Sequence, residues 1–237
     1  MMDLPDGPEL EAVLEPDPAE IPVRGAETAE QPSAPLKRRL MITGPVHARI
    51  GIKDVAGDPE LVRFIKSQGQ HYSFHALRLS CSFRPAEDEP FTGCWVGIEL
   101  SRADDVAAEP PIAWSMEPHS LEQLMDVPPA FKFNAELKLP FVSLGGSVTR
   151  KSGAERTAAF LQAYGELGAE PSWEFTRIGR AELRGMQQLK LVIRTPAGVP
   201  VEGKTTIEAN VERRRLGVMK YRATVPGDPP ATNFRLD

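Results

Sequence analysis

Two histidines come closest to the spacing of a metal site in this 237-residue chain. His71 and His75 lie four residues apart, which on a helix would bring two imidazoles to one ion. Their surroundings alternate like a strand, however, and four strand residues span about 13 Å, whereas zinc–nitrogen bonds are about 2 Å long. His119 lies downstream near a turn, and neither cysteine has a metal-like spacing. The sequence therefore predicts no metal site, and it indicates no cofactor.

The two cysteines lie in consecutive alternating stretches on either side of the turn-forming segment 85–90. If that segment closes a hairpin, facing positions sum to 175 and Cys81 lies opposite Cys94. We expect two buried thiols that behave as small hydrophobic side chains. The alternative is a redox-switchable cross-strand disulfide, because the Cβ atoms of facing residues lie about 4.5–5.5 Å apart.

The other face of the same predicted hairpin carries Trp95, flanked by Gly93 and Gly97, with Ser80 and Arg78 facing them from the other strand. A large aromatic side chain among small residues is either covered by another part of the chain or exposed as a platform for a partner. Tryptophan is enriched among the residues that dominate binding energy at protein interfaces. Trp95 and Arg78 are therefore candidate partner-binding residues.

A basic cluster, Arg213, Arg214 and Arg215, falls at the tip of a second predicted hairpin, in which facing positions sum to 430. Such a cluster can bind an anion. Three more arginines of the basic C-terminal half join it as candidates: Arg177, Arg180 and Arg184. No nucleic-acid motif or set of stacking aromatic residues accompanies them, so the sequence does not favour nucleic acid as the partner.

Near the N-terminus, Leu10, Val13 and Leu14 have the i, i+3, i+4 spacing of one helical turn among acidic residues. A turn of this kind can dock in a groove of a partner. The other interpretation is chance spacing in a disordered segment. These three residues complete the candidate partner-binding set.

Catalytic motifs are not found in the sequence. There is no Gly-x-Ser-x-Gly elbow, no phosphate-binding loop and no dinucleotide fingerprint. No clear helix follows Gly145-Gly146-Ser147, and the adjacent Asp104 and Asp105 would point to opposite sides of a strand. The sequence thus predicts no catalytic residues, although residues distant in sequence that converge in a cleft would escape this search.

The elements that position these residues are mostly strands, because apolar and polar residues alternate from about residue 36 onward. The strands we expect lie near residues 46–50, 77–84, 93–100, 112–117, 131–139, 142–149, 172–178, 189–193, 207–211 and 219–225. Two helices are expected. The first spans residues 58–66, where Pro59 suits a first helical position. The second spans residues 153–167 and begins with capping-box spacing, although this stretch is also compatible with a strand.

Charge separates the N-terminal segment from the rest. Residues 1–35 hold nine acidic residues, one arginine and seven prolines, for a net charge of −8, whereas residues 36–237 carry +3. A segment with so few large apolar residues does not offset its ordering entropy, so we expect residues 1–35 to be disordered. No apolar run reaches the about 18 residues of a membrane span, and no secretory signal is visible. The expected location is a bacterial cytoplasm, and the 19 arginines against nine lysines indicate a GC-rich genome.

The sequence as a whole predicts a mainly β fold with two packed antiparallel sheets, as in a β-sandwich, and one or two short helices. Residues 36–237 would form a single domain after the disordered tail. The expected function is a non-catalytic adaptor that binds another protein through a sheet face or edge, modulated by the acidic tail. The alternatives are a hydrolase-like enzyme with a cleft between the sheets, and an anion-binding module that uses the basic C-terminal half.

Overall fold

Antiparallel strands make up most of the computed structural model of the chain, as the alternation predicts. The structure describes residues 4, 7, 9–17, 34–103, 109–124, 157–179, 182–213, 217–225 and 232–237. The strands in this part are β1 (Glu9–Pro16), β2 (Leu36–Arg49), β3 (Tyr72–Phe83), β4 (Phe91–Arg102), β5 (Ile112–Glu117), β6 (Ser120–Leu124), β7 (Thr157–Tyr164), β8 (Ser172–Thr176), β9 (Gly185–Pro196), β10 (Val201–Arg213), β11 (Gly217–Thr224) and β12 (Asn233–Leu236). The expected strands at 131–139 and 142–149 lie outside the described residues.

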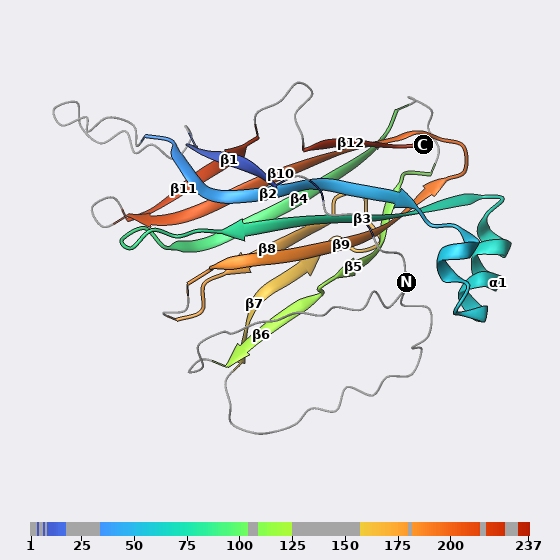
Figure 1. Cartoon of the computed structure of the whole chain (residues 1–237), viewed down its shortest axis with the longest axis horizontal. Helices are drawn as coiled ribbons and strands as arrows, with labels where there is room; N and C mark the ends of the chain where they lie inside the picture. Colours follow the sequence, from blue (N-terminus) through green and yellow to red (C-terminus); the bar gives the residue numbers. More distant parts are fainter. Residues whose placement is uncertain are drawn as a thin grey trace.

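All of these strands belong to one curled sheet (Figure 1). Its order is β5-β9-β3-β2-β1-β11-β10-β4-β8-β7-β6, and β12 pairs with the first part of β10. The expectation of two separate packed sheets is therefore wrong. The curled sheet has the form of a half-barrel, and its inner face holds one large apolar core.

Strand β1 is the reason for this difference. It pairs with β2 on one side and with β11 on the other, so it joins two groups of strands that would otherwise be separate sheets. Ala12 and Leu14 of this strand are completely buried in the core. Disorder is therefore the wrong expectation for residues 9–16. Residues 18–33 of the same acidic segment lie outside the described part.

The expected hairpin between residues 77–84 and 93–100 does not form. β3 pairs with β2 and β9, whereas β4 pairs with β10 and β8. Residues of the two strands meet across the core instead: the rings of Phe83 and Phe91 lie 5.4 Å apart, and those of Phe83 and Phe175 lie 5.3 Å apart. Alternation identified the buried side chains correctly, but it does not determine which strand lies alongside.

A single α-helix in the described part, α1 (Pro59–Gln68), confirms the first helix expectation. Asp58 caps it by accepting hydrogen bonds from the backbone N–H groups of Glu60 and Leu61, at 2.9 and 3.1 Å. After the short 3₁₀ turn η2 (Ile52–Val55), the helix lies at one end of the sheet (Figure 1). It covers a second apolar cluster on the outer face of the strands, centred on Phe74.

The second expected helix is a strand. Residues 157–164 form β7, which pairs with β6 and β8 and places Leu161 in the core. At the other hairpin the expected register is confirmed, because Val211 faces Met219 and Glu208 faces Arg222. Its tip, which includes Arg214 and Arg215, lies outside the described residues.

Candidate functional site

The outer surface of the sheet has two regions, which differ in whether a described element packs on them. At one end, helix α1 and its apolar side chains pack on the outer side of β2, β3, β5 and β9; we call this the covered end. The outer side of β8, β4, β10 and β11 has no such layer among the described residues, and we call it the open face. The exposed aromatic side chain of the open face is Trp95, which is 38% exposed.

Trp95 lies flat along its own strand and rests on Gly97. A Cβ atom at Gly97 would stand 2.0 Å from Cη2 and 2.3 Å from Cζ2 of the indole, so the ring occupies the space of the missing side chain. Glycine in the interior of a strand commonly marks such a close approach. The ring therefore has one face seated on the backbone and the other directed to solvent, and Gly97 is what permits this orientation.

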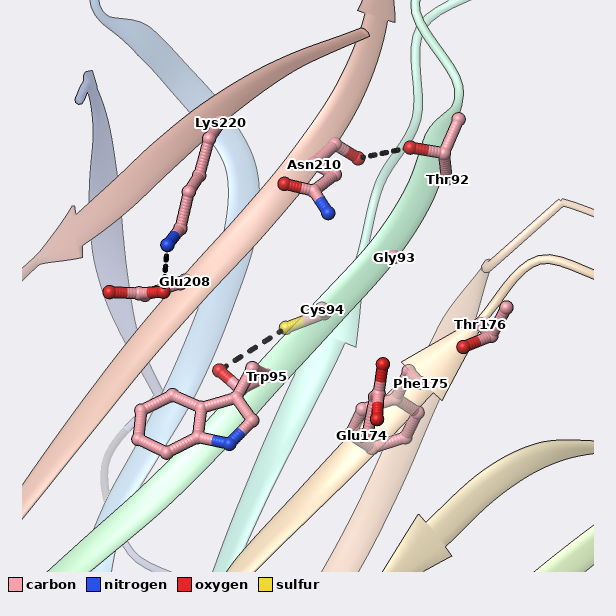
Figure 2. Close-up of a pocket in the computed structure, with 10 residues that line it drawn as sticks. All are labelled: Thr92, Gly93, Cys94, Trp95, Glu174, Phe175, Thr176, Glu208, Asn210 and Lys220. Atoms are coloured by element: carbon pink, nitrogen blue, oxygen red, sulfur yellow. Dashed lines mark hydrogen bonds and ion pairs between the residues drawn. The ribbon is translucent and has the colours of Figure 1, made fainter. Parts of the chain in front are cut away.

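Carboxylates flank the indole on both neighbouring strands (Figure 2). Trp95 is the register partner of Glu208 in β10 and of Glu174 in β8, and facing residues have Cβ atoms about 4.5–5.5 Å apart. Glu208 forms ion pairs with Lys220 at 2.7 Å and with Arg222 at 3.5 Å. The exposed Glu174 forms no ion pair within the part of the chain that the structure describes.

These side chains border a shallow groove of about 560 Å³. Gly93 forms part of its floor, and its walls include Trp95, Glu174, Glu208 and Asn210. A second groove of about 500 Å³ lies further along β4 and β10, where Glu99 and Lys204 face each other. The two grooves lie on opposite sides of Gly97 along β4, so the open face offers an extended, polar surface with one aromatic ring at its centre.

Cysteine chemistry does not contribute to this surface. Cys94 borders the groove but is buried, and its pKa is raised well above the ordinary value by burial, with smaller contributions from Cys81 and Glu208. Burial also raises the pKa of Cys81 to about 12. Both thiols are free and protonated, and a protonated thiol is a poor nucleophile. The expectation that they face each other in a hairpin is wrong, because Cys81 pairs with Ile42 and Gln187.

Arg78 lies elsewhere, contrary to its expected position on the same hairpin face as Trp95. It borders a smaller groove of about 220 Å³ on the outer side of β2, β3 and β9, together with the exposed Met186. The structure therefore separates the two candidates that the predicted hairpin had joined. Trp95 and its flanking carboxylates form one site, and Arg78 belongs to another surface.

The described arginines of the anion-binding hypothesis are held by carboxylates of the same chain. Arg177 pairs with Glu212 at 2.8 Å, Arg213 with Glu89 at 2.8 Å, and Arg184 with Glu182 at 3.0 Å. Arg180, Arg214 and Arg215 lie outside the described residues. An incoming anion would have to compete with these internal carboxylates, so the three described arginines do not form a prepared anion site.

The histidines are also distributed differently from a metal site. His75 is buried on the inner face of β3, and its pKa is lowered to about 4, mainly by burial and then by Arg49 and His47. His71 is exposed, and the Nε2 atom of His119 lies 3.5 Å from a carboxylate oxygen of Glu166. Among the described residues, no group of three or more His, Cys, Asp or Glu side chains is placed to hold a metal ion.

The N-terminal candidates do not form a helical turn. Leu10 and Leu14 point to the core side of β1, whereas Val13 lies on the opposite side of the strand. The docking turn is therefore a wrong interpretation of their spacing. The same residues also carry the alternation of a strand, which is the signal that sequence analysis passed over.

One arrangement that sequence reasoning missed lies at the covered end. The guanidinium of Arg194 stacks on the rings of Tyr72 and Trp114, with its carbon 4.4 and 4.9 Å from the two ring centroids. Glu109 forms an ion pair with Arg194 and accepts a hydrogen bond from the Tyr72 hydroxyl at 2.8 Å. These four residues are spread over more than 120 positions, so only the sheet brings them together.

The sequence matches no protein-family model and no curated protein. In the described part of the chain, no helix has the length and apolar character needed to cross a membrane. The geometry of the open face is therefore what bears on function.

Proposed function

We propose that this chain is a non-catalytic interaction protein that binds another protein through the open face, with Trp95 as the central contact. The observation that carries the proposal is a tryptophan held flat and exposed at the middle of a sheet surface that none of the described elements covers. Tryptophan side chains near the centre of an interface supply a disproportionate share of binding energy. The ring is already seated on Gly97, so little conformational entropy is lost when a partner covers it.

The character of the surrounding surface supports a protein partner. The two grooves on either side of Gly97 lie along β4 and β10. Each is lined by polar side chains, which are typical of the rim of an interface. We also propose a bacterial cytoplasm as the location, which the free state of both cysteines supports. The net charge of −8 on residues 1–35 would modulate association by long-range attraction or repulsion.

The test compares Trp95→Ala with Met186→Ala as immobilised baits in a lysate of cells that produce the protein. Met186 is a matched control because it is 68% exposed and lies outside the open face. We expect at least one protein to be retained by the wild type and by Met186→Ala but lost from Trp95→Ala. That protein, once purified, should bind the wild type at least about tenfold more tightly than Trp95→Ala in calorimetry. Equal retention by both variants would refute the proposal.

A further inference from the structure

We infer that the groove beside Trp95 receives an arginine side chain of the partner protein, stacked on the exposed face of the indole. This inference rests on the proposed function and adds the chemistry of the contact. It is carried by three observations of the described residues: an internal precedent, the accessible ring, and an exposed carboxylate beside that ring.

The precedent is the covered end, where the chain binds its own arginine. Arg194 lies over Tyr72 and Trp114, and Glu109 neutralises its charge. An aromatic face with an adjacent carboxylate is a general way to bind a guanidinium, because the ring quadrupole attracts the cation and the carboxylate accepts its N–H groups. The outer side of this sheet thus already contains one complete site of this kind.

The open face holds the same components without the cation. Trp95 presents one ring face to solvent, and Glu174 lies beside it on β8. Within the described part of the chain, the rings that carry a guanidinium are those of Tyr72 and Trp114, and none lies over Trp95. A guanidinium from outside would complete the arrangement.

The charges around the indole favour a cation over an anion. Glu208 is balanced by Lys220 and Arg222. Glu174 and Glu99 are both exposed; Glu99 faces Lys204 on β10, whereas Glu174 forms no ion pair among the described residues and is the carboxylate left to accept a cation. Glu99 follows Gly97 on the same side of β4, so one of these carboxylates lies beside the indole and the other lies beyond it. Arginine suits the site better than lysine because its planar group stacks on a ring while its edge donates to a carboxylate.

The test uses the ¹⁵N-labelled full chain and an acetylated, amidated Gly-Arg-Gly peptide as the probe. The chain has three tryptophans, and the indole N–H signal that disappears in Trp95→Phe belongs to Trp95. We expect the arginine peptide to shift this signal and the backbone amide of Gly97, and the shift to weaken as salt is added. The same peptide with citrulline, which is neutral and nearly isosteric, should bind at least about twofold more weakly.

The carboxylates are tested by the double variant Glu99→Gln/Glu174→Gln. Its affinity for the arginine peptide should fall at least about twofold. The matched control is Glu60→Gln/Glu87→Gln, which removes the same charge from two exposed positions away from the open face. An equal loss in both double variants would mean that only net charge matters, and it would overturn the inference.

Two further results would also overturn the inference. One is equal binding of the arginine and citrulline peptides, and the other is no shift of the Trp95 signal with either peptide. Neither result bears on the proposed function, which fails only if Trp95→Ala retains the same proteins as Met186→Ala. The two proposals can therefore fail separately.

Discussion

Trp114 at the covered end and Trp95 on the open face lie on the outer side of the same sheet in contrasting environments. Trp114 packs against Phe64 and Phe74, at ring-centroid distances of 6.2 and 6.1 Å, and carries Arg194 on its face. Trp95 rests on a glycine between two glutamates, with no ring or cation over it in the described part of the chain. Trp114 therefore contributes to packing within the fold, whereas one face of Trp95 stays accessible to solvent.

Substitutions in the two regions should therefore differ most clearly in their effect on the free energy of unfolding. Burial of aromatic side chains under α1 contributes to the free energy of unfolding, whereas an exposed ring contributes little.

Phe74→Ala should be the most damaging of these substitutions. Phe74 is buried beneath α1, with its ring 5.6 Å from that of Phe64. Its truncation should lower the free energy of unfolding by about 3–5 kcal/mol. Trp95→Ala, by contrast, should lower it by less than about 1 kcal/mol. Urea unfolding followed by far-ultraviolet circular dichroism measures both values, and similar losses in the two variants would remove the proposed contrast.

On the inner face of β3, opposite the covered end, His75 should make the protein sensitive to acid. Its pKa is about 4 in the folded chain against 6.5 for an ordinary histidine, so the unfolded chain binds the proton first as the pH falls. The contribution of this group to stability is therefore complete above pH 6.5, declines below it and is lost near pH 4. The decline amounts to about 3 kcal/mol.

His75→Gln tests this assignment because glutamine does not titrate. The difference in unfolding free energy between pH 7 and pH 4.5 should become smaller in this variant than in the wild type. His71→Gln is the control, since His71 is exposed on the same strand end. If both variants keep the wild-type pH dependence, the acid sensitivity arises from other groups.

Asp58→Ala should have a smaller effect, confined to the helix. Loss of the two capping hydrogen bonds should lower stability by about 1 kcal/mol. The amides of α1 should then exchange with deuterium faster, while those of β4 and β10 keep their protection. Lys66→Ala, an exposed change in the last turn, is the control. Unchanged exchange in α1 would mean that packing on the sheet, and not the cap, holds the helix.

The contrast between the two regions also explains how far sequence analysis reaches. Alternation predicted which residues of β3, β4, β9 and β10 are buried, and Pro59 at a first helical position predicted α1. Strand neighbours could not be predicted in the same way. The apolar side chains of β3 meet those of β4 across the core, while the backbone of β3 hydrogen-bonds to β2 and β9. A β3–β4 hairpin would have buried the same side chains, so the alternation does not distinguish it from the observed pairing.

β1 shows the second reason for failure. Leu10, Ala12 and Leu14 recur at every second position, yet the prolines and net charge of residues 1–35 outweighed this short pattern. Its partners come from about residue 40 and from about residue 220, so nothing local marks it as the junction of the sheet. At the site, Trp95 was predictable as an isolated aromatic residue, but its flanking Glu174 depends on the pairing of β4 with β8.

The smallest change in stability is expected from Gly97→Ala, and this variant tests whether Trp95 belongs to the fold or to a binding surface. The new methyl group would occupy the position of the indole, 2.0 Å from Cη2, so the ring must leave its seat. Because the ring is the exposed end of a side chain, it can swing into solvent, and the free energy of unfolding should change by less than about 0.5 kcal/mol. Trp95 emission should shift to longer wavelength, measured as the difference from the same background with Trp95→Phe.

Gly93→Ala is the matched comparison, because its methyl group would lie 3.3 Å from the Phe175 carbonyl oxygen and 3.5 Å from Asn210, and would leave the indole in place. If Gly97→Ala instead lowers the free energy of unfolding by several kcal/mol while Gly93→Ala does not, the packing of the indole on Gly97 is part of the fold. Trp95 would then serve the structure as Trp114 does. A change in emission with an unchanged free energy of unfolding would instead show that the orientation of the ring does not contribute to the stability of the sheet. A side chain of a binding surface is expected to behave in this way.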